Sequence, residues 1–325
     1  MMRSTRRGLI ALGTAGIAMR ARAQETRYPE RAVTIVVPAA PGGGGDFTAR
    51  LLGDALTRSL GQAFVVENRV GGSGNVASIA VARAAPDGYT LLLAYSGTHV
   101  ANPALFPNLA WDPVRSFAPV ALVLRAPHVI VVKKDLPVRD LADLVAYARR
   151  HPGKLNYASS GAGTIQHIGG EQLAQLIGAP MVHVPYRGAG PAMNDLVAGT
   201  MDLMITTPPA VVGLVRDGSI RALAMASRAR HPMLPDVPTA AEAGLPGFEL
   251  EAWFGIYAPA GTLAPVVERL SAAIRRVTEM PEFRRRSEES GTYPAYMNPA
   301  ELAAFTASEL ATWSDLIRRL DIKAE

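Results

Sequence analysis

Short apolar runs alternate with helix-like stretches along most of the chain. Nine of these runs are nearly continuous in apolar character, which is typical of strands buried on both faces of a sheet, and we predict that they pair in parallel. The predicted strands are 33–39, 64–68, 90–96, 118–124, 129–134, 155–160, 181–186, 202–207 and 220–227.

Helical stretches fill the gaps between the predicted strands. The repeated strand–helix–strand order predicts an α/β fold with right-handed crossovers and mostly parallel sheets flanked by helices. The predicted helices are 47–60, 75–85, 138–151, 164–177, 189–199 and 209–217, followed by a final helical region through 264–280 and 299–320.

Two proline-rich segments divide this pattern. The segments "RAP" (125–127) and "SRARHPMLPDVPT" (227–239) bracket a block that begins and ends with predicted strands. A chain of 325 residues is long enough for two domains of ~100–200 residues each. We therefore predict that residues 24–125 and 227–325 form lobe 1 together, and that residues 126–226 form an inserted lobe 2.

The first 23 residues differ from the rest in charge. They carry five arginines and no acidic residue, and the apolar stretch "GLIALGTAGIAM" (8–19) precedes the small residues of "ARA" (21–23). This order predicts a signal peptide cleaved near Ala23 and a periplasmic protein. Without these arginines the chain has 28 basic and 28 acidic residues, so its net charge of +5 does not indicate nucleic-acid binding. The lack of cysteine excludes disulfides.

Two glycine-rich loops raise the question of a nucleotide site. In "PAAPGGGGDFTAR" (38–50) no lysine follows the glycines, as a P-loop would require. In "VGGSGNVA" (70–77) the spacing matches G-x-G-x-x-A, but the following strand, "TLLLAYSG" (90–97), lacks the acid that would hold a ribose. The second match is better explained by glycines that permit a sharp strand-to-helix turn.

Hydrolase and metal chemistry are also weakly supported. Ser159 and Ser160 stand in "YASSGAGT" (157–164), which lacks a nucleophile elbow. His167 and Glu171 are four apart on one predicted helix, but no third ligand is evident, so a hydrogen-bonded structural histidine is the favoured interpretation. We expect no cofactor and no metal.

Three predicted helices begin after small residues, at "PGGGGDFT" (41–48), "SSGAGTIQH" (159–167) and "YRGAGPA" (186–192). A helix N-terminus offers unpaired N–H groups and a partial positive charge, and glycine lets a ligand approach them. Neither 38–48 nor 157–168 contains Lys or Arg. An anion held there would rest on backbone N–H groups and on Ser, Thr and His side chains, which suits a compact carboxylate better than a polyphosphate.

Asp46 has two interpretations. An acid near a helix start accepts a backbone N–H and complements the helix dipole, which is worth ~1 kcal/mol. Alternatively, Asp46 binds the ammonium group of an amino-acid ligand. We favour the cap.

Several motifs resemble one family along essentially the whole chain after residue 23. They are "VVPAAPGGGGD" (36–46), "GQAFVVENRVGGSGNVA" (61–77), "APDGYTLLLA" (85–94), "HPGKLNYASSGAGTIQH" (151–167), "VHVPYRGAGPAMNDLVAGTMDLM" (182–204) and "LPDVPTAAEAGLPGFELEAWFGIYAPAGT" (234–262). In order and spacing they resemble the substrate-binding proteins of tripartite tricarboxylate transporters, the Bug family.

The resemblance implies a two-lobed, Venus-flytrap binding protein of the type II periplasmic class, with a carboxylate held between the lobes by loops 39–46, 95–98, 159–167 and 206–208. Relatives often carry Ser-Thr where Gly44-Gly45 stand, Asn where Ala162 stands, and Asp or Asn near Thr206. These departures favour a ligand with a less polar far end, a plain or aromatic carboxylate. The candidate ligand-binding residues are Ala39, Ala40, Gly42, Gly43, Asp46, Tyr95, Ser96, Ser159, Ser160, Gly163, Thr164, His167, Thr206 and Thr207.

Three functions remain open. By its resemblance the protein is a solute receptor, not an enzyme, that delivers a small carboxylate to two integral membrane transporter subunits, and we expect a monomer. The alternatives are an orphan carboxylate sensor that acts in signalling and, less favoured, a secreted enzyme acting on a small acid.

Overall fold

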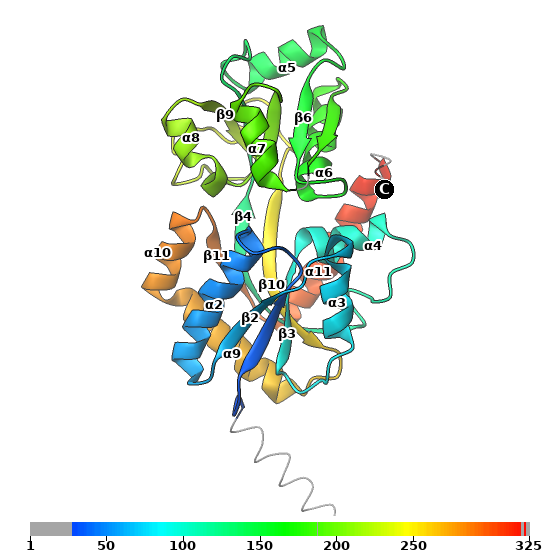
Figure 1. Ribbon diagram of the computed structural model, residues 1–325, viewed down its shortest axis with the longest axis vertical. Helices are drawn as coiled ribbons and strands as arrows, with labels where there is room; N and C mark the ends of the chain where they lie inside the picture. Colours follow the sequence, from blue (N-terminus) through cyan, green and yellow to red (C-terminus); the bar gives the residue numbers. More distant parts are fainter. Residues whose placement is uncertain (1–27, 187, 320–321, 323–325) are drawn as a thin grey trace, which may run out of the picture.

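Two lobes stacked along the long axis make up the protein (Figure 1). The computed structural model describes residues 28–186, 188–319 and 322, so the predicted signal peptide lies outside the described residues. Each lobe holds one β-sheet with helices packed on both sides, which confirms the two-lobed α/β fold.

The sheet of lobe 1 has six strands in the order β11-β4-β10-β3-β1-β2. Strand β1 pairs in parallel with β2 and β3, whereas β10 is antiparallel to both β3 and β4, and β11 is antiparallel to β4. The strands are β1 (Val33–Val37), β2 (Phe64–Asn68), β3 (Thr90–Tyr95), β4 (Phe117–Pro127), β10 (Glu251–Pro259) and β11 (Tyr293–Met297).

Five of the helices of lobe 1 form two groups: α2, α9 and α10 pack on one another, and α4 and α11 pack together with the helical turn Gly97–Ala101. Helix α3 packs on the strands β1, β3 and β10. The helices are α2 (Gly44–Leu60), α3 (Asn75–Ala82), α4 (Asn102–Leu105), α9 (Ala264–Glu279), α10 (Pro281–Glu289) and α11 (Pro299–Arg319).

The sheet of lobe 2 has five strands in the order β7-β6-β8-β5-β9. Strand β6 pairs in parallel with β7 and β8, and β5 is antiparallel to β8 and β9. The elements are β5 (Val129–Lys133), α5 (Leu141–Arg150), β6 (Asn156–Ser159), α6 (Ile165–Ile177), β7 (Val182–Pro185), α7 (Ala189–Val197), β8 (Leu203–Thr206), α8 (Val212–Arg216) and β9 (Ile220–Met225).

The strand directions differ from the prediction, because both sheets are mixed rather than mostly parallel. The apolar run of β5 is continuous because this strand lies inside the sheet, between β8 and β9, and is buried on both faces. Burial produces such a run whether the neighbouring strands are parallel or antiparallel. Neither β10 nor β11 was predicted as a strand. The five residues of β11 are all half-buried, so its sequence, "YPAYM", carries no apolar periodicity.

Three chain segments connect the lobes and hydrogen-bond to one another. The His128 N–H donates to the Leu250 carbonyl at 3.0 Å, and the Ala226 N–H donates to the His128 carbonyl at 2.7 Å. The Leu250 N–H closes the set by donating to the Ala226 carbonyl at 2.8 Å. The crossings at His128 and Ala226 lie close to the predicted boundaries at 125/126 and 226/227, whereas the one at Leu250 lies well after the second boundary. These boundaries stay a prediction.

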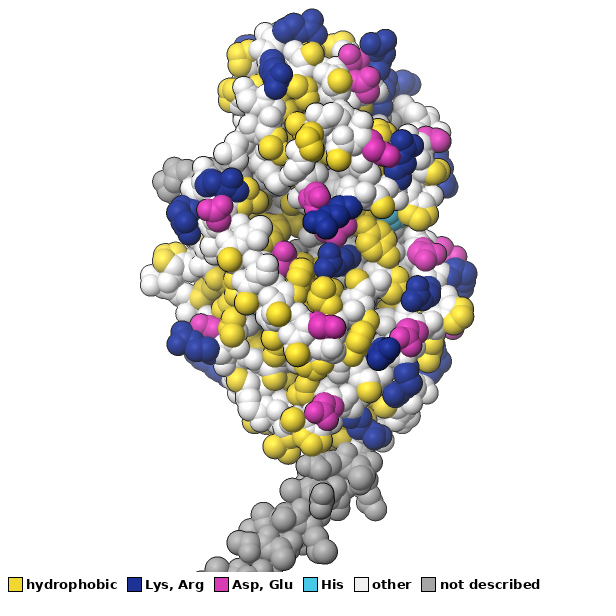
Figure 2. Space-filling model, turned by 180° about the vertical axis from the view of Figure 1, so that it is seen from behind, with side chains coloured by type: hydrophobic (Ala, Val, Ile, Leu, Met, Phe, Trp, Pro, Cys, Tyr) yellow, Lys and Arg dark blue, Asp and Glu magenta, His cyan; other side chains and the backbone are white. Residues whose placement is uncertain are grey.

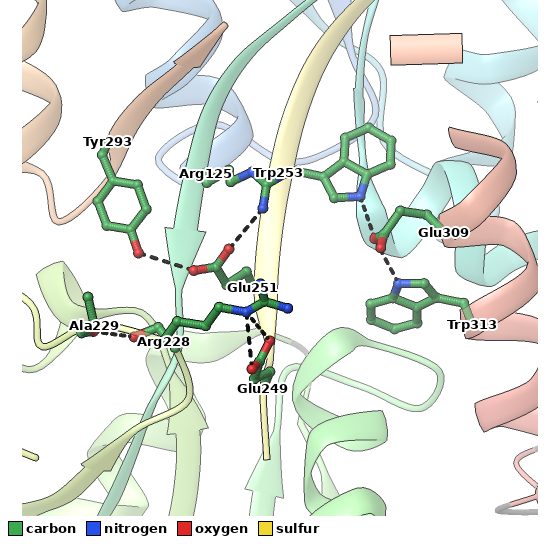
Figure 3. A network of polar contacts seen from close by, with 10 residues as sticks. Arg125, Arg228, Ala229, Glu249, Glu251, Trp253, Tyr293, Glu309 and Trp313 are labelled. Atoms are coloured by element: carbon green, nitrogen blue, oxygen red, sulfur yellow. Dashed lines mark hydrogen bonds and ion pairs between the residues drawn. The ribbon is translucent and has the colours of Figure 1, made fainter. Parts of the chain in front are cut away.

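Polar side chains surround these crossings on the lobe 1 side (Figure 3). Glu251 accepts a hydrogen bond from Arg125 at 3.3 Å and another from the Tyr293 hydroxyl at 3.2 Å. Nearby, the carboxylate of Glu309 on α11 accepts both indole N–H groups of Trp253 and Trp313, at 3.0 and 3.2 Å. These contacts attach β11 and α11 to the strands that lead into lobe 2.

Charged side chains of both signs are interspersed over the back of the molecule (Figure 2). This distribution agrees with the equal numbers of acidic and basic residues after residue 23. None of the described helices is both long enough and apolar enough to cross a membrane.

Candidate functional site

The loops that follow β1, β3, β6 and β8 lie at facing ends of the two lobes (Figure 1). In lobe 1, parallel pairing places the carboxyl ends of β1 and β3 at one edge of the sheet. In lobe 2, parallel pairing of β6 with β8 does the same for Ser159 and Thr206. Ligands of open α/β sheets gather at such edges.

The lobe 1 loop, residues 38–46, leads directly into helix α2. Residues 40–44 are exposed, and the helix begins after Gly43, which makes no side-chain cap. Gly42 has φ = +86°, a conformation that disfavours other residues. The N–H groups of Gly43, Gly44, Gly45 and Asp46 have no hydrogen-bond acceptor among the described residues, as expected for the first turn of a helix.

Asp46 holds this loop from within. Its side chain is buried, and its Oδ2 accepts the Gly42 N–H at 3.0 Å and Arg50 Nε at 3.0 Å. Its Oδ1 forms an ion pair with Arg50 Nη2 at 2.9 Å and accepts no hydrogen bond from the described residues. Burial raises the pKa of Asp46, but the hydrogen bonds from Arg50 and Gly42 outweigh burial, so this pKa lies below its ordinary value. The carboxylate is thus engaged by its own chain, which favours the capping interpretation over an ammonium partner.

One aromatic ring lies beside the glycines of α2, and a second ring pairs with the first. A Cβ at Gly44 would lie 3.2 Å from the Phe254 ring, and Phe254 pairs with Tyr95 across β10 and β3 with ring centroids 6.4 Å apart. Burial raises the pKa of Tyr95 to about 12, so its hydroxyl stays protonated. Phe254 was not among the predicted site residues: its segment, "EAWFGIYAP", is a core strand, and nothing in its pattern singles out one aromatic residue.

Ser96 and Ala39 play different parts at the same edge. The Ser96 hydroxyl is fully buried and has no hydrogen-bond partner among the described residues. The Ala39 carbonyl accepts the Asn68 side-chain amide at 3.0 Å, which ties the loop to β2. Ala40, by contrast, is exposed.

The lobe 2 loop, residues 159–164, folds on its own hydrogen bonds. The Gly161 N–H donates to Ser159 Oγ at 3.1 Å, and the Thr164 hydroxyl donates to the Gly161 carbonyl at 2.7 Å. Thr164 is also the N-cap of α6, because its hydroxyl accepts the His167 N–H at 3.5 Å. Ser160 Oγ donates to the Gln166 side chain at 3.0 Å.

These bonds sort the N–H groups of the lobe 2 loop into two sets. Those of Gly161, Gly163, Thr164 and His167 are used within the loop and first turn. The others have no acceptor among the described residues, and they belong to Ser160, Ala162, Ile165 and Gln166. The second set is available to an anion.

His167 serves as a hydrogen-bond acceptor in this loop. Its Nδ1 accepts the Gly163 N–H at 3.0 Å, and Glu171, four residues later, accepts the Tyr157 hydroxyl. No group of three potential metal ligands occurs among the described residues. The structural interpretation of His167 therefore agrees with the contacts.

Thr206 and Thr207 end β8 next to this loop. Thr206 is buried and Thr207 half-buried, and neither hydroxyl makes a hydrogen bond to another described residue. The lobes approach each other nearby, because a Cβ built on Gly163 would lie 3.0 Å from Leu105 Cδ1 of α4. Leu105, like Phe254, is a neighbour of the site that sequence patterns do not reveal.

Ser159 is poorly placed to act as a nucleophile. Its side chain is fully buried and its Oγ lies 2.7 Å from His183 Nε2, so a serine–histidine pair is present. However, the same Oγ already contacts the Gly161 N–H and carbonyl. The pair therefore serves the loop rather than an exposed substrate.

Comparison with known proteins identifies the family of the chain. The family model for the tripartite tricarboxylate transporter family receptor matches residues 48–322. A protein of the tcbD-tcbE intergenic region of a Pseudomonas species is 41% identical over 93% of this chain and 92% of its own length. Protein BugT of Bordetella pertussis is 35% identical over 97% of this chain and 96% of its own length.

Three solved structures are similar throughout. The periplasmic binding protein BugD has a TM-score of 0.81 and 35% identity, covering 92% of this chain and all of its own. MatC from Rhodopseudomonas palustris with bound malate has a TM-score of 0.78 and 39% identity, with 89% of this chain and 100% of that chain covered. An R. palustris protein with adipate has a TM-score of 0.84 and 36% identity, with 91% of this chain and 99% of that chain covered.

These relatives are receptors that bind solutes, not enzymes, and their family is periplasmic. Their similarity covers both lobes and all four loops of the candidate site. The chain therefore belongs to the tripartite tricarboxylate transporter receptor family, the Bug family of periplasmic binding proteins.

Proposed function

We propose that the protein is an extracytoplasmic receptor that binds a small carboxylate between its lobes and delivers it to a membrane transporter with two integral membrane subunits. One observation carries the proposal: two helix N-termini, of α2 and α6, offer unused N–H groups at facing ends of the lobes. No lysine or arginine stands in residues 38–48 or 157–168. Partial charges of this kind match one carboxylate better than a polyphosphate.

The residues proposed to contact the ligand follow from the unused groups. The N–H groups of Gly43, Gly44 and Gly45 bind it from lobe 1, and those of Ser160 and Ala162 bind it from lobe 2. Asp46, Ser159 and His167 act indirectly by holding the loops. Closure about the crossings at His128 brings the two sets together and expels water.

The far end of the ligand is proposed to be apolar, as in a plain or aromatic acid. The support is the ring of Phe254 beside Gly44 and the ring of Tyr95 behind it. The bound malate and adipate of two relatives show that the family accepts acids of different length and polarity.

Export and assembly complete the proposal. The charge and apolar pattern of residues 1–23 supports a signal peptide removed after Ala23, so the mature chain begins at Gln24. The receptor acts as a monomer in the periplasm. Intact-mass measurement of periplasmic protein tests the cleavage: a full-length mass from that fraction contradicts it.

A thermal-shift screen tests the ligand class. Malate, adipate, succinate and benzoate are compared with ATP and NAD, and at least one of the acids is expected to stabilise the protein. At a concentration about 100 times its Kd, a ligand adds about 2.7 kcal/mol to the free energy of unfolding. Stabilisation by ATP or NAD, with none by any acid, would overturn the proposal.

A further inference from the structure

A stack of three rings lies next to the lobe 2 loop. The ring of His183 is 5.0 Å from that of Tyr157 and 3.8 Å from that of His167, centroid to centroid. The two imidazole planes differ by only 7°, and the Tyr157 and His167 centroids are 6.5 Å apart, so His183 lies between the other two rings.

Three elements build this stack. His183 comes from β7, the edge strand of the lobe 2 sheet, and the register places it opposite Tyr157 of β6. Side chains two residues apart share a face, so Tyr157 and Ser159 point to the same side. Helix α6 covers that side and can pack closely because it carries glycine there: a Cβ at Gly170 would lie 2.1 Å from the Tyr157 ring.

The stack reaches the ligand loop through one hydroxyl. Ser159 Oγ lies 2.7 Å from His183 Nε2, 3.1 Å from the Gly161 nitrogen and 3.0 Å from the Gly161 oxygen. A hydroxyl donates one hydrogen bond and accepts two, so these three contacts satisfy it completely. The position of Oγ therefore fixes the orientation of the Gly161 peptide.

His183 is neutral at the pH of most binding experiments. Burial and the neighbouring His167 lower its pKa to about 4. Because Ser159 Oγ has one hydrogen, which the Gly161 carbonyl accepts, the three contacts hold together only when the neutral imidazole carries its hydrogen on Nε2 and donates it to Oγ. The hydrogen bond thus persists without a charge on the ring.

We propose that His183 is a positioning residue of the ligand site: its contact with Ser159 Oγ holds the 159–164 loop so that the N–H groups of Ser160 and Ala162 point to the ligand. This inference rests on the proposed carboxylate site. The effect passes from β7 through Ser159 to Gly161, and His183 itself does not contact the ligand. Ser159 is fully buried, so loss of the imidazole nitrogen leaves its Oγ without one of its three partners.

Two substitutions separate the hydrogen bond from the packing. His183→Phe keeps an aromatic ring in the stack but loses the nitrogen, whereas His183→Gln places an amide where Nε2 stood. With adipate, or with malate if adipate does not bind the unaltered protein, we expect His183→Phe to lose at least about tenfold in affinity and His183→Gln to lose less than about threefold. The control is His151→Phe, an exposed histidine of the same lobe at the end of α5.

A double-mutant cycle tests the route through Ser159. If His183 acts through this hydroxyl, Ser159→Ala and His183→Phe each remove the same interaction, and the double variant loses no more than about the larger single loss. Losses that multiply, or an unchanged affinity in folded His183→Phe, would overturn the proposal.

Hydrogen exchange of the ligand-free protein tests the positioning role of His183 separately from the proposal that the site binds a carboxylate. Peptides covering residues 159–167 should exchange faster in His183→Phe than in the unaltered protein, and they should not change in His151→Phe. Faster exchange with no acid bound by the unaltered protein would leave the positioning role standing and refute the proposed function. Unchanged exchange in His183→Phe would refute the positioning role, whatever binds.

Discussion

The two loops of the candidate site present N–H groups in the same way but are held by different means. In lobe 1 an exposed run of glycines is fixed by one buried carboxylate, Asp46, which pairs with Arg50. In lobe 2 the loop is fixed by neutral groups: two hydroxyls and the imidazoles of the stack. The glycines of lobe 1 therefore depend on a charged contact, with Asn68 holding the preceding Ala39 carbonyl, whereas the loop of lobe 2 depends on a network of neutral groups.

The loops also differ in what they tolerate. Gly43 has φ = −85°, and a Cβ there would meet only the Ala40 oxygen at 3.8 Å, so a side chain fits. Gly163 has φ = +74° and lies against Leu105, so any side chain there is strained. A substitution at Gly43 should therefore change ligand affinity without disturbing the fold, whereas a substitution at Gly163 should disturb the fold as well.

The largest expected effect is that of Gly43→Asp. The added carboxylate lies among the N–H groups of α2 and repels an anionic ligand, so we expect affinity to fall by more than about 100-fold, or about 2.7 kcal/mol. Gly43→Ala, the control for volume, should bind within a few-fold of the unaltered protein. Calorimetry with adipate or malate, and circular dichroism for folding, provide the measurement. Normal affinity in folded Gly43→Asp would remove α2 from the site.

The second-largest expected effect is that of Asp46→Asn, which should destabilise the lobe 1 loop. It leaves Arg50 without its partner and weakens the hydrogen bond to the Gly42 N–H, which should cost about 1–3 kcal/mol of unfolding free energy. The pKa of Asp46 is depressed in the fold, so its contribution is present above the unfolded pKa and is lost as pH falls through the folded value. Urea unfolding at pH 7 and at pH 3 measures the free energy of unfolding of Asp46→Asn and of the unaltered protein. The difference between their two values should be smaller at pH 3. An equal difference at both would contradict the role of the charge.

Lobe 2 should respond to pH in a different window. The folded pKa of His183, about 4, lies below its unfolded value near 6.5, so the unfolded chain binds more protons between these values. Stability from this group is complete above about pH 6.5 and decreases as pH falls towards 4, by at most about 1.4 kcal/mol per pH unit. His183→Gln should flatten the decrease in unfolding free energy measured over this range. An unchanged slope would show that the residue does not titrate as described.

Thr164→Val should have the smallest effect. It removes the hydroxyl that bonds the Gly161 carbonyl and caps α6, at a cost of about 1 kcal/mol in affinity and in stability. Thr164→Ser keeps the hydroxyl and should behave as the unaltered protein. Calorimetry and thermal unfolding of both variants distinguish the hydroxyl from the methyl group: equal losses in both would exclude the hydrogen bond as the cause.

Much of the fold followed from local patterns. Apolar runs located nine strands, and small residues located both helix N-termini, because each feature depends on neighbouring residues alone. Helix α2 nevertheless begins at Gly44 rather than at the predicted residue 47, so two of the glycines belong to its first turn. Strand direction did not follow, since β4 and β10 are brought together from distant parts of the chain and their burial is the same in either direction.

The site was predicted only in its backbone parts. Small residues at 42–45 and 161–163 indicate where N–H groups are open, but not which of them the loop itself uses. Phe254 lies in β10, which was not predicted as a strand, and His183 lies in a segment predicted as an ordinary buried strand; only the sheet register places them beside Gly44 and Ser159. Asp46 was predicted as a cap, but its pairing with Arg50 requires the helix to be in place.

A crystal structure with adipate or malate bound tests the central claim most directly. The account predicts one carboxylate between the lobes, with its oxygens about 3 Å from nitrogens of both sets: Gly43–Gly45 at the start of α2, and Ser160 or Ala162 before α6. A carboxylate held by an arginine or lysine side chain, or one that contacts a single lobe in the closed protein, would contradict it.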